Sequence, residues 1–287
     1  MMDWLEHWNK ALDYLEENLD GEISLEELGR LAGCSPYHFQ RMFSYLAGVP
    51  LKEYIRRRRM TRAAADLRAG DKVLDVALRY GYDSPTAFNR AFQAVHGLAP
   101  SLAKQDGVKL KAFPRIRFKF ALKGDTEMEY QIVSRGEFRI VGFRTPLAMD
   151  SEESFQMVPR FWAEVGQRVG ALIPLIDPEI PGVLGVSTCH RDEENYYYIA
   201  VASNAPAPEG THAWTVPAAT WAVFSGTGQQ PTAIQELQKR IVSEWLPDSG
   251  YEWSQAPDVE VYQSEPGAEE QRFQVWLPIQ KQTVNKS

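Results

Sequence analysis

The sequence predicts two domains: an all-α domain with two helix-turn-helix units, followed by an α+β domain of two strand-helix-strand-strand repeats. A nine-residue pattern that occurs twice in the first hundred residues predicts the first domain. Alternating hydrophobic residues, which dominate after residue 126, predict the strands of the second. With 287 residues, 44% of them hydrophobic, the chain is long enough to bury two cores.

The repeated pattern is S-P-x-x-F-x-R-x-F, found at residues 35–43 and again at 84–92. Every shared position is offset by 49 residues, and each copy reaches a glycine five residues after its last Phe. A Ser-Pro pair opens a helix well, because proline is tolerated in the first turn. A glycine, Gly33 or Gly81, separates this helix from the one before it, which is the helix-turn-helix arrangement.

The remaining helices of this domain follow from local signals. Ser24 and Glu27 form a capping box that predicts a helix start. A helix is expected at about 4–18, and a longer one at 51–69 joins the two copies. The run Arg56–Arg59 makes this joining helix strongly basic, and we expect its arginines to contact phosphates or other residues rather than bases.

The second helix of a helix-turn-helix unit enters the major groove of DNA. Arginine suits guanine there, and Gln or Asn suits adenine. The joining helix of about 19 residues would separate the two reading helices by about 28 Å, close to one DNA turn. We therefore expect residues 1–106 to bind double-stranded promoter DNA by themselves. The candidate DNA-binding residues lie outside the apolar stripes: Tyr37, Gln40, Arg41, Thr86, Asn89 and Arg90.

Charge is distributed unevenly between the two predicted domains. The net charge of −7 is unusual for a nucleic-acid binder. Residues 1–120, however, hold 19 Lys and Arg against 15 Asp and Glu, whereas the remainder holds 12 against 23. This asymmetry fits a basic module joined to an acidic one, although an excess of this size is also common by chance.

The second domain is expected to fill residues 127–280, after a basic linker at 107–126 and before a polar tail at 281–287. Its pattern is strand-helix-strand-strand, twice. Helices are predicted at 152–170 and 231–245. Strands are predicted at 137–144, 183–189, 195–202, 219–225, 257–263 and 271–279.

Alternation within the last two strands suggests a binding site. Phe273, Val275, Leu277 and Ile279 form one apolar face, which we expect to lie under the helices, with Val259 and Val261 on the same side. Glu260, Tyr262 and Trp276 would then share the other face. A carboxylate among aromatic rings is costly unless it meets a cation, which the rings also attract. The alternative for Glu260 is a solvated carboxylate on an exposed face of the sheet. The alternative for the tryptophans is that they belong to the ordinary hydrophobic core.

The repeated helices and the segment Tyr54–Met60 resemble the DNA-binding domain of the AraC family of transcription regulators, over residues 4–106. The second domain resembles GyrI-like effector-binding domains. This resemblance implies multidrug recognition of small, apolar cations. It implies that Glu260 is the pocket carboxylate and that Trp221 forms an aromatic wall. One of the rings of Tyr196, Tyr197 and Tyr198 would add to this aromatic wall. Alternation does not decide which of the three points inward, and Tyr198 is the candidate.

The expected partners are DNA, a small-molecule effector and RNA polymerase. Two alternatives remain for the second domain: a protein-interaction module, or a hydrolase with Glu260 as acid or base. We expect no enzyme activity, no metal and no cofactor, because the histidines are scattered and neither cysteine belongs to a C-x-x-C motif. Two cysteines and the absence of an apolar run of membrane length favour a cytoplasmic protein without membrane contact.

Overall fold

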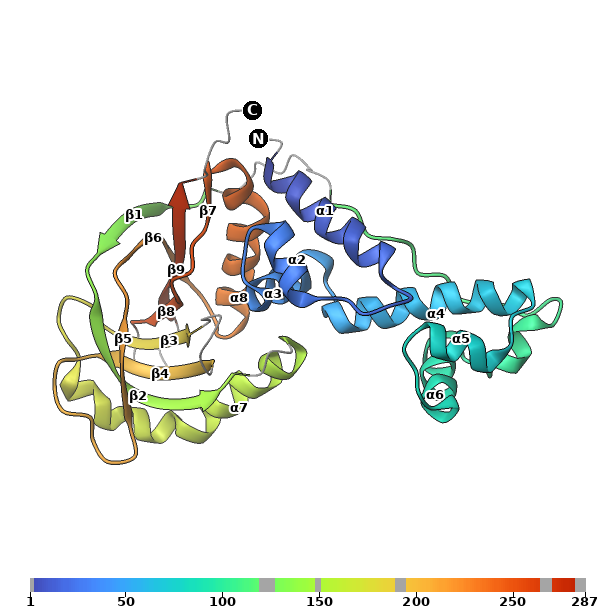
Figure 1. Ribbon diagram of the computed structural model, residues 1–287. Coiled ribbons are helices and arrows are strands. Elements are labelled where there is room, and N and C mark those ends of the chain that lie inside the picture. Colours follow the sequence, from blue (N-terminus) through green and yellow to red (C-terminus); the bar gives the residue numbers. More distant parts are fainter. Residues whose placement is uncertain (1–2, 119–126, 148–150, 189–194, 264–269, 282–287) are drawn as a thin grey trace. The chain divides into compact units, whose positions relative to one another are not determined.

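A computed structural model describes residues 3–118, 127–147, 151–188, 195–263 and 270–281 (Figure 1). The chain forms two compact units. The helical unit comprises Met2–Ala32 and Phe39–Phe120. The sheet unit comprises Ala121–Ser287 together with the short segment Gly33–His38. The predicted polar tail beyond Lys281 lies outside the described residues.

The predicted helices of the first hundred residues are all present. Both helix-turn-helix pairs are confirmed, α2 with α3 and α5 with α6, and α4 has the predicted bounds. A short 3-10 turn, η1, follows α6 (Figure 1). The helices are α1 Asp3–Glu17, α2 Leu25–Ala32, α3 Pro36–Ala47, α4 Leu51–Ala69, α5 Val73–Arg79, α6 Pro85–His96 and η1 Pro100–Lys104.

Capping side chains explain where these helices begin. The Ser24 hydroxyl accepts a hydrogen bond from the Glu27 amide at 3.1 Å, as the capping box predicts. Ser35 and Ser84 accept in the same way from amides three residues later. Gly33 and Gly81 have φ of 74° and 80°, a left-handed conformation that only glycine adopts readily, so both turns require them.

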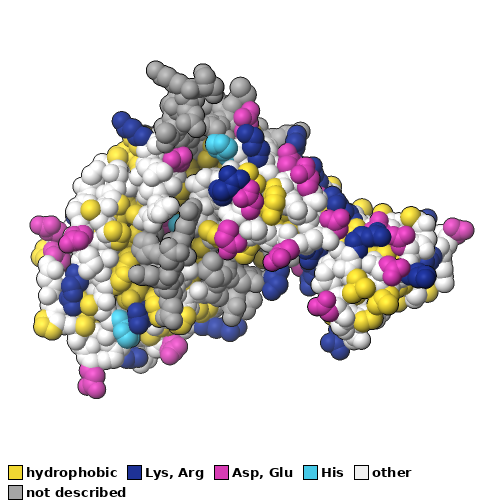
Figure 2. Space-filling model, viewed as in Figure 1, with side chains coloured by type: hydrophobic (Ala, Val, Ile, Leu, Met, Phe, Trp, Pro, Cys, Tyr) yellow, Lys and Arg dark blue, Asp and Glu magenta, His cyan; other side chains and the backbone are white. Residues whose placement is uncertain are grey.

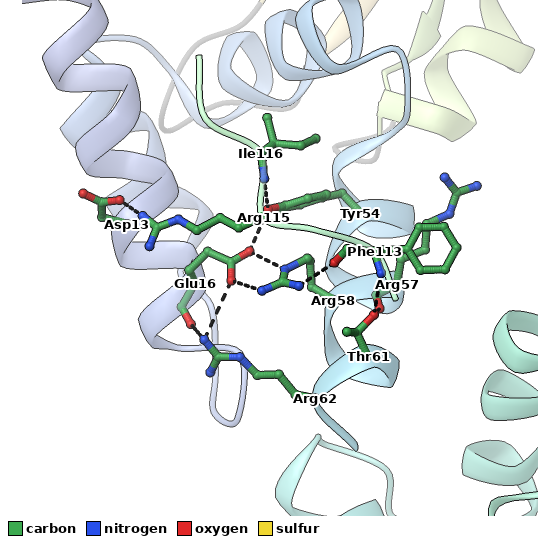
Figure 3. A network of polar contacts seen from close by, with 10 residues as sticks. All are labelled: Asp13, Glu16, Tyr54, Arg57, Arg58, Thr61, Arg62, Phe113, Arg115 and Ile116. Atoms are coloured by element: carbon green, nitrogen blue, oxygen red, sulfur yellow. Dashed lines mark hydrogen bonds and ion pairs between the residues drawn. The ribbon is translucent and has the colours of Figure 1, made fainter. Parts of the chain in front are cut away.

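Residues 108–118 contain no helix or strand, yet they are hydrogen-bonded along the helical unit. The Phe113 amide donates to Thr61 at 3.1 Å, and the Ile116 amide donates to the Tyr54 hydroxyl at 3.1 Å (Figure 3). Further along, Asn9 both donates to and accepts from the Phe118 backbone. Because these bonds reach α1 and α4, this segment completes the helical unit rather than only leading away from it.

Beneath this segment lies a buried carboxylate. Glu16, 2% exposed, accepts hydrogen bonds from Arg58 at 2.8 Å on each oxygen and from the Tyr54 hydroxyl at 2.6 Å (Figure 3). Arg58 also donates to the Phe113 carbonyl, and Arg62 donates to the Glu16 carbonyl. Burial raises the pKa of Glu16, but the bonds from Arg58 and Tyr54 outweigh burial and hold the pKa below its ordinary value.

A fragment of residues 1–106 is therefore expected to be less stable than one of residues 1–118. The longer fragment keeps the backbone bonds to Thr61, Tyr54 and Asn9, each of which contributes about 0.5–1.5 kcal/mol. We expect a loss of about 3 kcal/mol on truncation. Thermal unfolding followed by circular dichroism at 222 nm measures it. Equal melting temperatures would show that residues 107–118 do not stabilise the helices.

The sheet unit contains the predicted strands and helices and three strands that the pattern did not predict: β1, β5 and β7. The long helix predicted at 231–245 is α8 followed by a π turn, Ile241–Trp245. The elements are β1 Tyr130–Arg135, β2 Phe138–Pro146, α7 Ser151–Val169, β3 Val183–Thr188, β4 Tyr196–Ala202, β5 His212–Val216, β6 Ala219–Thr227, α8 Thr232–Arg240, β7 Tyr251–Trp253, β8 Asp258–Tyr262 and β9 Arg272–Lys281.

Within the described residues the strands form one antiparallel sheet, in the order β1-β6-β9-β8-β3-β4-β2-β5, with β7 paired to β9. Helix α7 packs on β2 and β4, and α8 packs on β6 and β9 (Figure 1). The strands therefore have two distinct faces. Phe143, Tyr197 and Ile199 cluster with α7 residues on the helix-covered face. Leu184, Tyr198, Trp221, Val259 and Trp276 belong to a separate buried cluster.

Candidate functional site

The two reading helices differ in how their predicted DNA-binding residues are exposed. On α6, Thr86 and Arg90 are exposed and Asn89 is half-buried, while Phe88 and Phe92 pack inward. This is the arrangement that the repeat predicted.

On α3 the expectation that these side chains face solvent is wrong for two of three residues. Tyr37 and Gln40 are each 6% exposed. Tyr37 lies in an apolar cluster with Phe161, because Gly33–His38 packs as part of the sheet unit. Arg41 is half-buried, and its guanidinium lies 5.8 Å from the centre of the Tyr45 ring. Helical spacing alone could not show this, because Tyr37 packs against residues that lie more than a hundred positions away in the sequence.

The arginines of α4 are engaged within the helical unit. Arg58 binds Glu16, and Arg59 donates to the carbonyls of Leu19 and Gly21. Arg56 and Arg57 pair with Glu53. Figure 2 shows Lys and Arg interspersed with Asp and Glu on the visible face of the helical unit. Within this run, Arg58 and Arg59 therefore bind groups of other segments of the helical unit, whereas Arg56 and Arg57 pair within α4.

Glu260 is the centre of a polar cluster on the helix-covered face of the sheet. Its carboxylate accepts hydrogen bonds from the Tyr262 hydroxyl at 2.9 Å, the Tyr197 hydroxyl at 3.2 Å and the Gln238 amide at 2.7 Å. These donors come from β8, β4 and α8. All three of these donors are uncharged.

Helix α7 contributes an aromatic side chain to the same place. The Trp162 indole donates to the Tyr197 hydroxyl at 3.0 Å. Its ring meets the Tyr262 ring edge-to-face, with centroids 5.0 Å apart. Trp162, Tyr262 and Glu260 are half-buried, whereas Tyr197 is 3% exposed. We call Glu260, Tyr197, Tyr262, Gln238 and Trp162 the carboxylate cluster.

The predicted partnership of Glu260 with Trp276 is wrong. Antiparallel register pairs Val259 with Trp276 and Glu260 with Val275, so Glu260 and Trp276 project from opposite faces. Val259 and Val261 accordingly lie with Trp276, not on the helix side. The prediction was right about which residues of each strand share a face. It placed the two strands one residue out of register, and a slip of one residue moves every side chain to the other face.

Trp221 and Tyr198 also lie on the face opposite Glu260. Trp221 is fully buried, and its indole donates to the Pro257 carbonyl at 3.2 Å. Tyr198 is 1% exposed in the same cluster. Of the candidate rings near Glu260, the structure retains Tyr262 and replaces Tyr198 by its neighbour Tyr197, because neighbouring strand residues point to opposite faces.

Three members of the carboxylate cluster, Gln238, Trp162 and Tyr197, were not predicted. For Gln238 and Trp162 the sequence pattern holds an indication of their place. Gln238 follows Ile234 and precedes Ile241 on the buried stripe of α8, so it is an amide in an apolar position. Trp162 lies one residue off the apolar stripe of Phe161, Val165 and Val169. Nothing in the sequence distinguishes Tyr197 from Tyr198.

Within the described residues, no group of three or more His, Cys, Asp or Glu side chains could hold a metal ion. In the same part of the chain, no helix has the length and apolar character that crossing a membrane requires.

Two helix-turn-helix units together with a separate sheet domain that carries a carboxylate cluster define a DNA-binding regulator with an effector-binding domain. Comparison with known proteins agrees. Residues 28–105 match a helix-turn-helix domain family, and residues 131–279 match the integron-associated effector binding protein family. The chain belongs to the AraC family of transcription regulators, with an N-terminal helix-turn-helix domain and a C-terminal GyrI-like effector-binding domain, and is not an enzyme.

Individual relatives resemble one or both domains. The transcriptional activator AarP of Providencia stuartii is 40% identical over 95 residues, which are 33% of this chain and 70% of AarP. The transcriptional regulator Rob of Salmonella typhimurium is 27% identical over 262 residues, 88% of each chain. The structure of SAV2435 bound to tetraphenylphosphonium is similar with a TM-score of 0.46 and 22% identity, covering 53% of this chain and 94% of that one.

Proposed function

We propose that this regulator binds an apolar cation next to Glu260 and that the bound cation controls reading of promoter DNA. The carboxylate cluster carries the proposal. A half-buried carboxylate beside aromatic rings attracts an incoming cation more strongly than a neutral molecule of the same shape. The faces of Trp162, Tyr197 and Tyr262 supply further attraction for a cation.

The topology supports a site between two related halves. We propose that β2-α7-β3-β4 and β6-α8-β8-β9 are the two strand-helix-strand-strand repeats predicted from the sequence. Outward from the centre of the sheet, one half runs β3-β4-β2 and the other runs β8-β9-β6, the same order of equivalent strands. The halves meet where β3 pairs with β8, at Gly185 opposite Glu260. Ligands commonly bind where two such halves meet.

For the domain boundaries, we propose that the DNA-binding domain extends to about residue 118 and that the effector domain begins at about residue 127. The bonds from Phe113, Ile116 and Phe118 to α1 and α4 support this. On the DNA side we propose Arg90, Asn89 and Thr86 of α6 and Arg41 of α3 as reading residues, with RNA polymerase as a further partner of the DNA-bound regulator.

Control of DNA reading by the effector has a physical basis within the sheet unit. The His38 imidazole lies 3.2 Å from the Asp258 carboxylate and stacks on the Trp253 ring, with the ring centroids 4.5 Å apart. Asp258 precedes Glu260 by two residues on β8, and Tyr37 shares its cluster with Tyr197. A cation bound beside Tyr197 would alter the packing of Tyr197 against Tyr37, which lies in the first turn of the reading helix α3.

The experiment that tests the proposal compares two probes of matched shape. Tetraphenylphosphonium and tetraphenylborate carry four phenyl groups around a central atom but have opposite charges. We expect the phosphonium ion, and not the borate ion, to bind the full chain in isothermal titration calorimetry and to change its affinity for promoter DNA. Equal binding of both ions would contradict a carboxylate counter-charge. Binding of neither would favour a protein-interaction module.

The DNA-binding assignment has its own test. Replacing Arg90 with alanine is expected to weaken binding to the specific promoter site by about 1–3 kcal/mol, because an exposed arginine on a reading helix contacts a base edge. Arg79→Ala is the matched control, since Arg79 on α5 is paired with Asp66 and Asp71. Mobility-shift titrations on specific and random DNA measure both. Equal losses on the two DNAs would make Arg90 a phosphate contact instead.

A further inference from the structure

Gly185 lies in the interior of β3, where glycine is unfavourable because it has no side chain to pack and loses the most backbone freedom. Its φ is not positive, so the backbone conformation does not require glycine. What requires it is space. A Cβ atom at this position would overlap the Tyr197 hydroxyl oxygen and would lie 2.9 Å from a Glu260 carboxylate oxygen and 3.2 Å from the Tyr197 ring.

Other glycines of the sheet are restricted for a different reason. A Cβ at Gly142 would meet the backbone of Ile199 and Ala200, and a Cβ at Gly226 would meet the Phe273 ring at 2.7 Å. Those two positions serve close packing of the fold. At Gly185 the nearest atoms are instead two polar groups of the carboxylate cluster, which are hydrogen-bonded to each other.

The Tyr197 hydroxyl that occupies this space connects the cluster. It donates to Glu260 and accepts from the Trp162 indole, so one oxygen makes both bonds. Trp162 in turn contacts the Tyr262 ring, and Tyr262 donates to Glu260. Glu260, Tyr197, Trp162 and Tyr262 therefore form a closed ring of contacts. Displacing the Tyr197 hydroxyl breaks two hydrogen bonds and releases Trp162.

We propose that Gly185 is a positioning residue of the effector site: its missing side chain admits the Tyr197 hydroxyl, which orients both Glu260 and Trp162 toward the bound cation. This inference rests on the proposed function, since it gives Gly185 a role in cation binding. In this proposal Gly185 does not contact the ligand itself and acts through Tyr197.

The test compares Gly185→Ala, Tyr197→Phe and the double variant by calorimetric titration with tetraphenylphosphonium. We expect Gly185→Ala to weaken binding by about tenfold, equivalent to two lost hydrogen bonds. Tyr197→Phe removes the same hydroxyl directly, so it should weaken binding by a similar factor, and the double variant should bind no more weakly than either single variant. Gly136→Ala is the control, because a Cβ at Gly136 meets nothing within 4 Å. Wild-type affinity in Gly185→Ala, or losses that add up in the double variant, would overturn the inference.

A second readout needs no ligand. In protein labelled with 15N-tryptophan, the Trp162 indole resonance is identified by its loss in Trp162→Phe. Both Gly185→Ala and Tyr197→Phe should shift this resonance, because each removes the acceptor of the indole N–H. An unchanged resonance in Gly185→Ala would refute the positioning role. If the resonance shifts but wild-type protein binds no tetraphenylphosphonium, the proposed function fails while the geometry at Gly185 stands.

Discussion

Replacing Glu260 with glutamine is expected to weaken tetraphenylphosphonium binding roughly 30-fold, or about 2 kcal/mol. Glutamine keeps the size of the side chain and removes only its charge. The loss should fall at the low end of the range for buried charged contacts, because Glu260 is half-buried and water partly screens it. Tyr262 and Tyr197 can still donate to the remaining carbonyl oxygen, and Gln238 can turn its amide so that its own oxygen accepts from the new NH2 group, so folding should be little affected.

Calorimetric titration of the full chain measures this loss. The matched control is Glu252→Gln on β7, since Glu252 is an exposed acceptor from Gln280 outside the carboxylate cluster. Its affinity should equal that of the wild type. If Glu260→Gln and Glu252→Gln bind the cation equally well, Glu260 is not the counter-charge and another group must hold the effector.

Arg58→Ala is expected to destabilise the helical unit by about 3–5 kcal/mol, the largest effect predicted for a single substitution on stability. The variant leaves Glu16, 2% exposed, without its bidentate partner, and it also removes the donor to the Phe113 carbonyl. Glu16 would keep the longer contact to Arg62, at 3.7 Å, and the bond from Tyr54. Loss of the main partner of a buried carboxylate still costs far more than the ion pair contributes. Thermal unfolding measures the loss, and hydrogen exchange in peptides from α1 and α4 locates it.

Arg57→Ala is the matched control for Arg58, because Arg57 lies on the same helix and pairs with Glu53 of that helix, while its guanidinium lies over the Phe113 ring, so it touches the same segment without binding Glu16. It should cost less than about 1 kcal/mol. Replacing both Glu16 and Arg58 with methionine should recover much of the stability lost in Arg58→Ala, since no charge is then left buried. Similar losses in the Arg57 and Arg58 variants would contradict the role given to Glu16.

Acid should weaken the same network. The pKa of Glu16 is lower in the folded chain than its ordinary value of 4.5. Its ionised form therefore stabilises the fold fully at neutral pH, and this contribution is lost as the pH falls below about 4.5 through the folded-state pKa. The wild type should lose stability over this range more steeply than the double methionine variant.

Local signals in the sequence determined the helical unit almost completely. The signals involved are short-range: each affects the backbone only within a few residues. They are the two S-P-x-x-F-x-R-x-F copies, the Ser24 cap and the glycines at 33 and 81. Helix starts and turns depend on such short-range hydrogen bonds and backbone conformations, so their positions can be read without knowing the tertiary structure. The same reasoning identified Glu260 and Tyr262 as neighbours on one face of a strand.

Only the tertiary structure decided which side chains meet Glu260. Alternation fixes parity within a strand, but the pairing of Glu260 with Val275 rather than Trp276 depends on register between strands, which no local pattern records. Tyr197, Gln238 and Gly185 reach the carboxylate from three other elements. Likewise Tyr37 looks exposed from helical spacing and is buried by residues more than a hundred positions away, because burial is a property of packing between distant segments.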